Sequence, residues 1–319
     1  MTDKLEAWPP LPLAEWQATR DTLHMCTQIV GKIRLALSPK MNHWWEVPFY
    51  LTARGLTTSP IPYGTETFEI LFDLIEHKVL IETSAGATKT VPLAARPVAD
   101  FYAELMSQLN SLGITVKIWT QPSEVPNPVH FDQDRVHSAY DPVYAQRFWR
   151  VLVSVDSVFK EFRARFVGKS SAVHFFWGSF DLAVTRFSGR RAPERPDADS
   201  MTREAYSHEV ISVGFWPGTG EIDTTFYAYA APEPQGFANA AVLPDAAFYN
   251  TQLSEFFLPY EKVRQAASQR ESLLSFCQST YDAGATLGNW NRQDLERGSP
   301  SERSPGTSEI GGKMSADSD

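Results

Sequence analysis

Apolar residues recur at helical spacing in front of two histidine-containing stretches. The first run extends from Trp16 to Leu37, and its apolar positions lie three or four residues apart. The second run, from Tyr144 to Phe166, keeps the same spacing. It follows Asp141-Pro142, a typical pair for an N-cap and a first helical residue. The pattern therefore predicts one long amphipathic helix in each half of the chain.

Alternating apolar and polar positions follow each histidine-containing stretch. Phe68–Leu74 and Val79–Glu82 alternate in this way around a short polar turn. Glu209–Phe215 and Thr224–Tyr229 flank a turn that is rich in proline and glycine. Each half is therefore expected to contain an antiparallel hairpin.

A helical stripe is expected after each hairpin. Val98–Leu112 has helical spacing, and Asp245–Phe257 shares a Phe-Tyr pair with it. A last helix is expected to begin after Ser268, because Glu271 lies three residues further on and completes a capping box.

The order of helix, histidine stretch, hairpin and helix thus occurs twice, over 16–119 and 142–259, which indicates an internal duplication. We expect an α+β fold in which internally duplicated helix/antiparallel-sheet/helix halves pack into one body. Residues 1–120 would form the first half and 142–290 the second, joined by a proline-rich connector over 121–141. Residues 291–319 are expected to be a disordered tail, because small and polar residues dominate them.

The histidine stretches are MNHWWEVPFYL (41–51) and AVHFFWGSFDL (172–182). If each is a strand, His43 and His174 begin a row of side chains that faces the core. The opposite face of the second strand, with Trp177 and Asp181, suits the wall of a pocket. The residues leave three interpretations open: capped histidines at strand ends, which we favour, histidines that line one pocket between the halves, or a shared metal ion.

An arginine, a glycine and hydroxyl groups follow both stretches, as RGLTTS (54–59) and TRFSGRR (185–191). Guanidinium groups beside serine hydroxyls and glycine amides can hold a phosphate or a carboxylate, although a solvated strand end has the same composition. The candidate ligand-binding residues are Trp177, Arg186, Arg54, His43 and Arg190. The candidate catalytic residues are His174, Asp181 and Glu209.

Composition narrows the class of protein. The chain has 319 residues and a net charge of −9, which argues against a general nucleic-acid binder. Its two cysteines lie far apart and match neither a disulfide framework nor a zinc site. No stretch is apolar enough for a signal peptide or a membrane span, so a soluble cytoplasmic protein is expected.

Motif searches assign no cofactor and no metal. The chain has no nucleotide-binding glycine loop, no G-x-S-x-G elbow and no H-E-x-x-H pair. A nucleotide-dependent or serine-hydrolase mechanism therefore has no support. The oligomeric state is left open.

Four long motifs carry a resemblance to a known family. They begin NHWWEVPFYL (42–51), HFFWGSFDL (174–182), AYSHEVISVG (205–214) and YAAPEP (229–234). They are similar to a family of uncharacterised bacterial and fungal proteins, over about residues 8–290. The resemblance implies one full-length unit of cytoplasmic type and no particular activity.

Three functions are compatible with this sequence. The favoured one is a protein that binds a small anionic or aromatic molecule in a pocket between two similar halves. The alternatives are an enzyme with His174 as acid or base in the same pocket, and a protein-interaction module.

Overall fold

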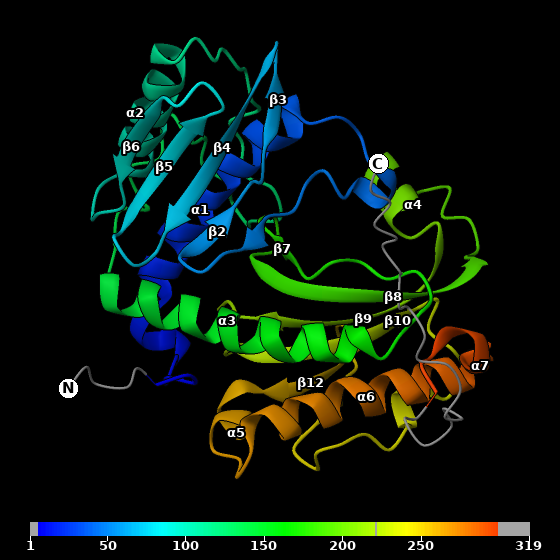
Figure 1. Cartoon of the computed structure of the whole chain (residues 1–319). Coiled ribbons are helices and arrows are strands. Elements are labelled where there is room, and N and C mark those ends of the chain that lie inside the picture. The colour runs from blue at the N-terminus through cyan, green and yellow to red at the C-terminus, as the bar shows by residue number, and fades with distance from the viewer. Residues whose placement is uncertain (1–5, 221, 299–319) are drawn as a thin grey trace, which may run out of the picture.

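The computed structural model describes residues 6–220 and 222–298. It contains helices and two antiparallel sheets, which confirms the predicted α+β class (Figure 1). The strands of the first sheet are β1 (Tyr50–Leu51), β2 (Gly55–Thr57), β3 (Ile61–Tyr63), β4 (Glu66–Asp73), β5 (Lys78–Thr83) and β6 (Thr88–Pro92). Those of the second are β7 (His174–Phe176), β8 (Asp181–Arg191), β9 (His208–Trp216), β10 (Thr225–Ala231), β11 (Phe248–Asn250) and β12 (Glu255–Pro259).

Helices surround both sheets. The longer ones are α1 (Leu13–Leu37), α2 (Val98–Ser111), α3 (Pro142–Ala164) and α6 (Gln269–Leu287). The shorter ones are α4 (Ser200–Ala205), α5 (Tyr260–Arg264), α7 (Arg292–Leu295) and the 3-10 turns η1 (Asn42–Trp44) and η2 (Phe237–Asn239). The helices predicted before each histidine stretch, the helix over 98–112 and the helix after Ser268 are all confirmed.

The first sheet has the order β1-β2-β4-β5-β6, with β3 paired to β4. Phe68, Ile70 and Phe72 of β4 are buried, as the alternation along that strand predicts. Helix α2 contacts α1 and β6, and α1 also contacts β3. The first half is therefore a sheet whose apolar row is covered by two helices.

The second sheet has the order β11-β12-β10-β9-β8-β7. One face is covered by α3, which contacts β8, and by α6, which contacts β9 and β10. Leu182, Val184 and Phe215 lie on this face and are fully buried. The other face carries polar and aromatic side chains, and it supports the candidate site described below.

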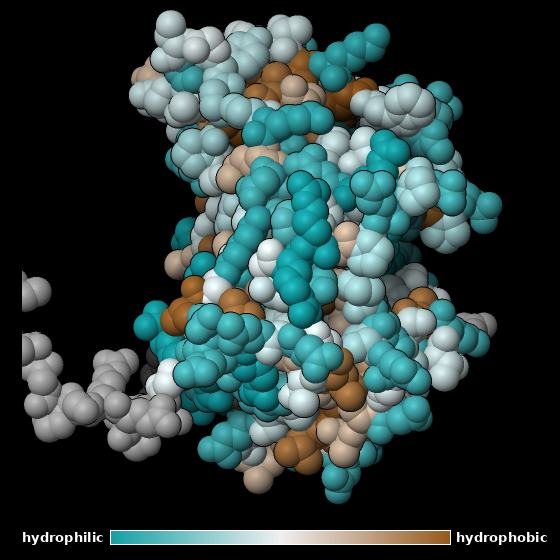
Figure 2. Space-filling model, turned by 90° about the vertical axis from the view of Figure 1, so that its right-hand side faces the viewer, coloured by the Kyte–Doolittle hydropathy of each residue, from teal (hydrophilic) through white to brown (hydrophobic). Residues whose placement is uncertain are grey.

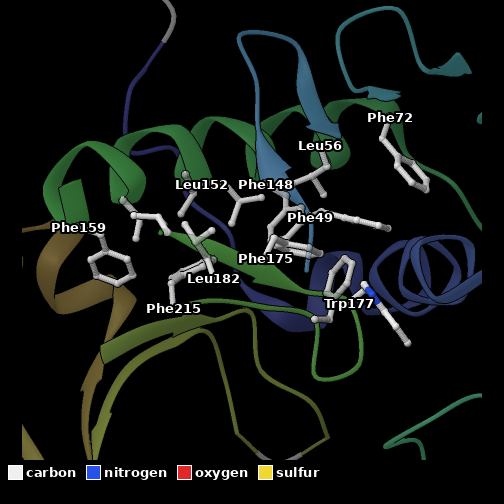
Figure 3. Close-up of a cluster of buried hydrophobic side chains, with 14 of the residues drawn as sticks. Phe49, Leu56, Phe72, Phe148, Leu152, Phe159, Phe175, Trp177, Leu182 and Phe215 are labelled. Carbon is white, nitrogen blue, oxygen red and sulfur yellow. The ribbon is translucent and has the colours of Figure 1, made fainter. Parts of the chain in front are cut away.

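A short bridge joins the two sheets. The backbone N–H of Phe49 donates to the carbonyl of Phe175 at 2.8 Å, and the Phe175 N–H donates back at 2.9 Å. Figure 3 shows side chains of both halves meeting here, with Phe49 and Phe175 beside Phe148 of α3. The halves therefore share one hydrophobic core.

One predicted helix is wrong. Asp245–Phe257 contains strands β11 and β12 instead of a helix. The side-chain oxygen of Asn250 accepts hydrogen bonds from the backbone N–H groups of Gln252 and Leu253, at 3.0 and 3.1 Å. This local turn closes a hairpin, and Phe256 then pairs with Ala228 of β10. In this segment, pairing with neighbouring strands decides the structure, although the apolar residues have helical spacing.

The expected strand over Met41–Leu51 is also wrong in its first part. His43 lies in the 3-10 turn η1, and both His43 and Trp44 have a φ of 59°. Extended pairing begins only at Phe49, which bridges to Phe175. A row of alternating side chains that begins at His43 therefore does not exist.

The continuous alternation of side chains expected after His174 is interrupted by a turn. Strand β7 ends at Phe176, and β8 begins at Asp181 after a tight reversal. His174 pairs with Ala183, and Phe176 pairs with Asp181. Paired residues share a face, so His174 lies on the same face as Asp181 and opposite to Leu182. The expectation that His174 and Asp181 lie on opposite faces of one strand is therefore wrong.

The internal duplication is not confirmed by these elements. Each half has a long helix before its sheet, but the histidine stretches differ in conformation, and β11 and β12 occupy the position of the expected helix. The ordered chain also continues past Trp290. Helix α7 follows, and the Arg297 N–H donates to the Arg165 carbonyl at 3.0 Å. The rest of the expected disordered tail, 299–319, lies outside the described residues.

The N-cap of α3 provides a test of local stability. The Asp141 carboxylate accepts hydrogen bonds from the N–H groups of Val143 (2.8 Å) and Tyr144 (3.2 Å). Asp141→Ala should lower the free energy of unfolding by about 1 kcal/mol, because these donors lose their protein acceptor. Urea denaturation would measure the change, with the exposed Ser157→Ala on the same helix as control. Equal stabilities of the two variants would contradict the capping role.

Candidate cationic pocket

A surface hollow of about 470 Å³ lies where η1 meets the ends of β8 and β9 and helix α4. Its lining residues, which define what we call the cationic pocket, are Asn42, His43, Lys169, Arg191, Ser200, Arg203, Glu204, Ser207 and His208. Figure 2 views the molecule from the side that carries α4, and hydrophilic side chains cover most of the middle of that face. The pocket combines three basic side chains (Lys169, Arg191 and Arg203), two histidines and one carboxylate.

His43 is held by α4 and by Lys169. Its Nδ1 lies 3.1 Å from the carbonyl oxygen of Glu204 and 3.3 Å from that of Ala205. Because both partners only accept, Nδ1 carries the proton and Nε2 presents a lone pair. Lys169 Nζ lies 2.6 Å from Nε2 and donates to it. The positive φ of His43 directs the ring to these partners instead of into the sheet.

The Lys169 amine also lies close to aromatic rings. Nζ is 5.4 Å from the centre of the Trp45 ring and 5.0 Å from that of Phe187. Both rings pack together beneath His43, with ring centres 5.9 Å apart. The two rings thus lie beside His43 and Lys169, and Lys169 bonds to an imidazole instead of to a carboxylate.

Both pocket histidines have a lowered pKa, to which burial contributes most. Burial lowers the pKa of His43 from its usual value, and the Lys169 charge lowers it further. Burial also lowers the pKa of His208, and Arg191 and Lys169 add to this effect. An anion bound beside these imidazoles would oppose the shift and favour their protonated forms.

Lys169, Arg191 and Arg203 have no ion-pair partner among residues 6–220 and 222–298. Neighbouring Arg190, by contrast, pairs with Glu209 at 2.7 Å and donates to the carbonyls of Gly288 and Asn289. An irregularity in the β8–β9 pairing after Phe187 includes Gly189, whose φ is 85°. Arg191 is then paired with His208 and lines the pocket.

His174 lies outside the pocket, behind Trp45. It is 2% exposed, and its ring centre is 5.7 Å from that of Trp45. Trp45 also contacts His43, at 5.2 Å between ring centres, so both histidines contact the same indole. Burial lowers the pKa of His174 to about 3, and Arg34 and Arg163 contribute. His174 is therefore neutral at physiological pH, and its Nδ1 has no hydrogen-bond partner in the described chain.

Asp181 lies on the polar face of the second sheet, in a cluster that we call the tyrosine face (Asp181, Tyr206, Tyr227 and Tyr229). Tyr227 donates a hydrogen bond to the Asp181 carboxyl group, and its ring stacks on Tyr229. The Tyr206 and Tyr229 hydroxyl oxygens are 3.0 Å apart. Gly214 leaves room for the Tyr227 ring, since an added Cβ would lie 2.1 Å from its Cζ. No hydrogen bond joins Asp181 to His174, although both are on this face.

The other residues singled out from the sequence are dispersed. Arg186 is 1% exposed and lies over the rings of Phe162 and Tyr281. Trp177 is buried and donates from Nε1 to the Val47 carbonyl at 2.7 Å. Arg54 pairs with Asp73 at 2.6 Å. Of the candidate residues, only His43 lines the cationic pocket, and the roles assigned to the others stay predictions.

Lys169 and Arg203 were not singled out from the sequence. Lys169 lies in the loop between α3 and β7, and its carbonyl accepts a hydrogen bond from the Phe187 N–H at 3.0 Å. This contact places the loop along β8. Arg203 belongs to α4. The N-cap of this helix, Asp199, lies in a charged stretch of the sequence, so the capping pattern could not be recognised there. Neither residue has a local motif, because the pocket is formed only by contacts between distant segments.

Two searches of the described chain gave negative results. Within residues 6–220 and 222–298, no group of three or more His, Cys, Asp or Glu side chains is arranged to hold a metal ion. In the same part of the chain, no helix combines the length and the apolar character that crossing a membrane requires.

Comparison with known proteins gives one match. A family model described as "Family of unknown function (DUF5996)" matches residues 8–297. No curated protein and no solved structure matches the chain.

Proposed function

The chain belongs to the DUF5996 family, whose function is unknown, and we propose that its cationic pocket binds a small anionic molecule through a phosphate or carboxylate group. The observation that carries this proposal is the set of three cations without an ion-pair partner in the described chain. Charge-assisted hydrogen bonds from guanidinium and ammonium groups are among the strongest that a protein can offer an anion.

The neutral histidines add to the recognition of an anion. His208 and His43 have pKa values lowered in part by the neighbouring cations. A bound anion would raise these pKa values, so binding should take up protons and strengthen as the pH falls through the histidine range. Glu204 is the one acidic residue in the lining, and its charge offsets part of the attraction that the three basic side chains exert on an anion.

The lining of the pocket draws on both halves of the chain. Asn42 and His43 come from the first half, and the other lining residues come from the second. The Trp45 and Phe187 rings pack beneath His43 and support its imidazole at the edge of the pocket. Neither ring belongs to the lining, so the proposal keeps the anionic ligand expected from the sequence and not the aromatic one.

Replacement of either pocket arginine tests the proposal. Arg191→Ala and Arg203→Ala should each weaken the binding of inorganic phosphate about tenfold, because each removes one charge-assisted contact worth roughly 1.4 kcal/mol. Isothermal titration calorimetry at constant ionic strength would measure this. Pyruvate serves as the carboxylate probe in a parallel titration.

Arg270→Ala is the matched control, since Arg270 lies on α6 and pairs with Glu161. It should leave the affinity unchanged. If no saturable binding of either probe is detected, or if the control variant weakens binding as much as Arg191→Ala, the cationic pocket is not an anion site.

A further inference from the structure

The Lys169 amine has an unusual partner. Its Nζ donates to the Nε2 lone pair of His43 at 2.6 Å, while His43 Nδ1 is held by two backbone carbonyls. An imidazole in this position can accept a proton from the ammonium group. Lys169 is also an exposed residue on the lining of the pocket, so a ligand can reach it.

Two other lysines have different acceptors. Lys160 of α3 pairs with the Asp156 carboxylate at 2.6 Å. Lys32 donates to the hydroxyl oxygen of Ser123 at 3.0 Å. Neither has a histidine nitrogen as acceptor. The Lys169–His43 pair therefore differs in chemistry and not only in location.

We propose that Lys169 is a nucleophilic amine that forms an imine with a small anionic carbonyl compound, such as a 2-oxo acid, with His43 as its base. This proposal rests on the proposed function, because Arg191 and Arg203 would hold the anionic group of that compound. Burial lowers the pKa of the Lys169 amine, which acts in the same direction as the His43 acceptor.

The reaction balances without any further reagent. The Lys169 ammonium passes one proton to His43 Nε2, and the amine lone pair attacks the carbonyl carbon to form a C–N bond. The carbonyl oxygen takes the proton from the imidazolium, which gives a carbinolamine that is protonated on nitrogen. That nitrogen then returns one proton to His43 Nε2, and the imidazolium delivers it to the hydroxyl group. The hydroxyl group leaves as water while the nitrogen lone pair forms the C=N bond of a protonated imine. The ammonium group and the carbonyl compound are thus converted to an iminium group and water.

Reductive trapping tests the proposal directly. The full chain would be incubated with pyruvate and sodium borohydride, whose hydride converts an imine to a stable secondary amine. Peptide mass spectrometry would then quantify the adduct at Lys169 and at Lys160, the internal control. We expect the adduct predominantly at Lys169. His43→Asn should reduce it about a hundredfold, the lower part of the range for a positioned general base.

Two further variants make the result decisive. Lys169→Arg keeps the positive charge, cannot form an imine and should abolish the specific adduct, whereas Lys160→Arg should leave adduct formation at Lys169 unchanged. Thermal melting would confirm that each variant is folded. Equal labelling of Lys169 and Lys160, or full labelling in folded His43→Asn, would overturn the proposal.

The same experiment separates this inference from the proposed function. Saturable phosphate binding without specific labelling would leave the anion site standing and reject the imine. Specific labelling that excess phosphate does not suppress would support the reactive lysine and count against the anion site. Specific labelling suppressed by phosphate would support both.

Discussion

Trp177→Ala is expected to lower the free energy of unfolding by about 3–5 kcal/mol, the cost of truncating a large buried aromatic residue. Trp177 is 3% exposed and packs against Gly31 of α1, where an added Cβ would lie 2.3 Å from the indole. Its Nε1–H also satisfies the buried Val47 carbonyl. The free energy of unfolding of a globular protein is only about 5–15 kcal/mol, so this one substitution should remove a large part of it.

Urea denaturation followed by far-ultraviolet circular dichroism would measure the loss without relying on tryptophan fluorescence. Trp119→Ala is the matched control, since Trp119 is 71% exposed, and it should change the stability by less than about 0.5 kcal/mol. Trp177→Phe keeps most of the volume and should give an intermediate loss if the alanine variant does not fold. Similar stabilities of Trp177→Ala and Trp119→Ala would rule out the packing role and restore a ligand-contact role for Trp177.

Asp181→Asn is expected to stabilise the protein above neutral pH. Burial raises the pKa of Asp181 from 3.8 to about 7, with Glu124 and Glu255 adding to the rise and the Tyr227 hydrogen bond opposing it. The folded state therefore holds a proton that the unfolded chain loses near pH 4. The resulting stability is fully present below that pH and is lost as the pH rises to about 7.

The size of this pH-dependent change in stability follows from the pKa shift of Asp181. Three pKa units at 1.36 kcal/mol each give an upper value of about 4 kcal/mol between acidic and mildly alkaline pH. Burial also raises the pKa of Glu255 to about 7, which adds a change of the same sign. Asparagine resembles the neutral acid and accepts from Tyr227, so the variant should lose much of the pH dependence.

Urea denaturation near pH 5 and near pH 8 would test this prediction, with the exposed Asp245→Asn as control. Relative to the wild type, Asp181→Asn should gain about 2–3 kcal/mol in stability between pH 5 and pH 8, because about two of the three pKa units lie above pH 5. The prediction fails if wild type and variant differ by the same amount at both pH values.

The arginines after the second histidine stretch illustrate how far local patterns define a site. The composition of TRFSGRR indicated anion recognition, and Arg191 does line the cationic pocket. The sequence could not distinguish it from Arg186, which is buried among aromatic rings, or from Arg190, which pairs with Glu209. The irregular pairing around Gly189 makes that distinction, because it decides which side chain faces α4.

The sequence by itself determined the long helices, the β4–β5 and β9–β10 hairpins and the caps at Asp141 and Ser268. These features depend on neighbours within a few residues, so periodicity and capping chemistry specify them. Only the tertiary structure decided the rest. The turn after Phe176 reversed the faces of β8, and strand pairing replaced a predicted helix at β11 and β12. The pocket unites η1, the Lys169 loop, β8, β9 and α4, and contacts between such distant segments leave no pattern in any one of them.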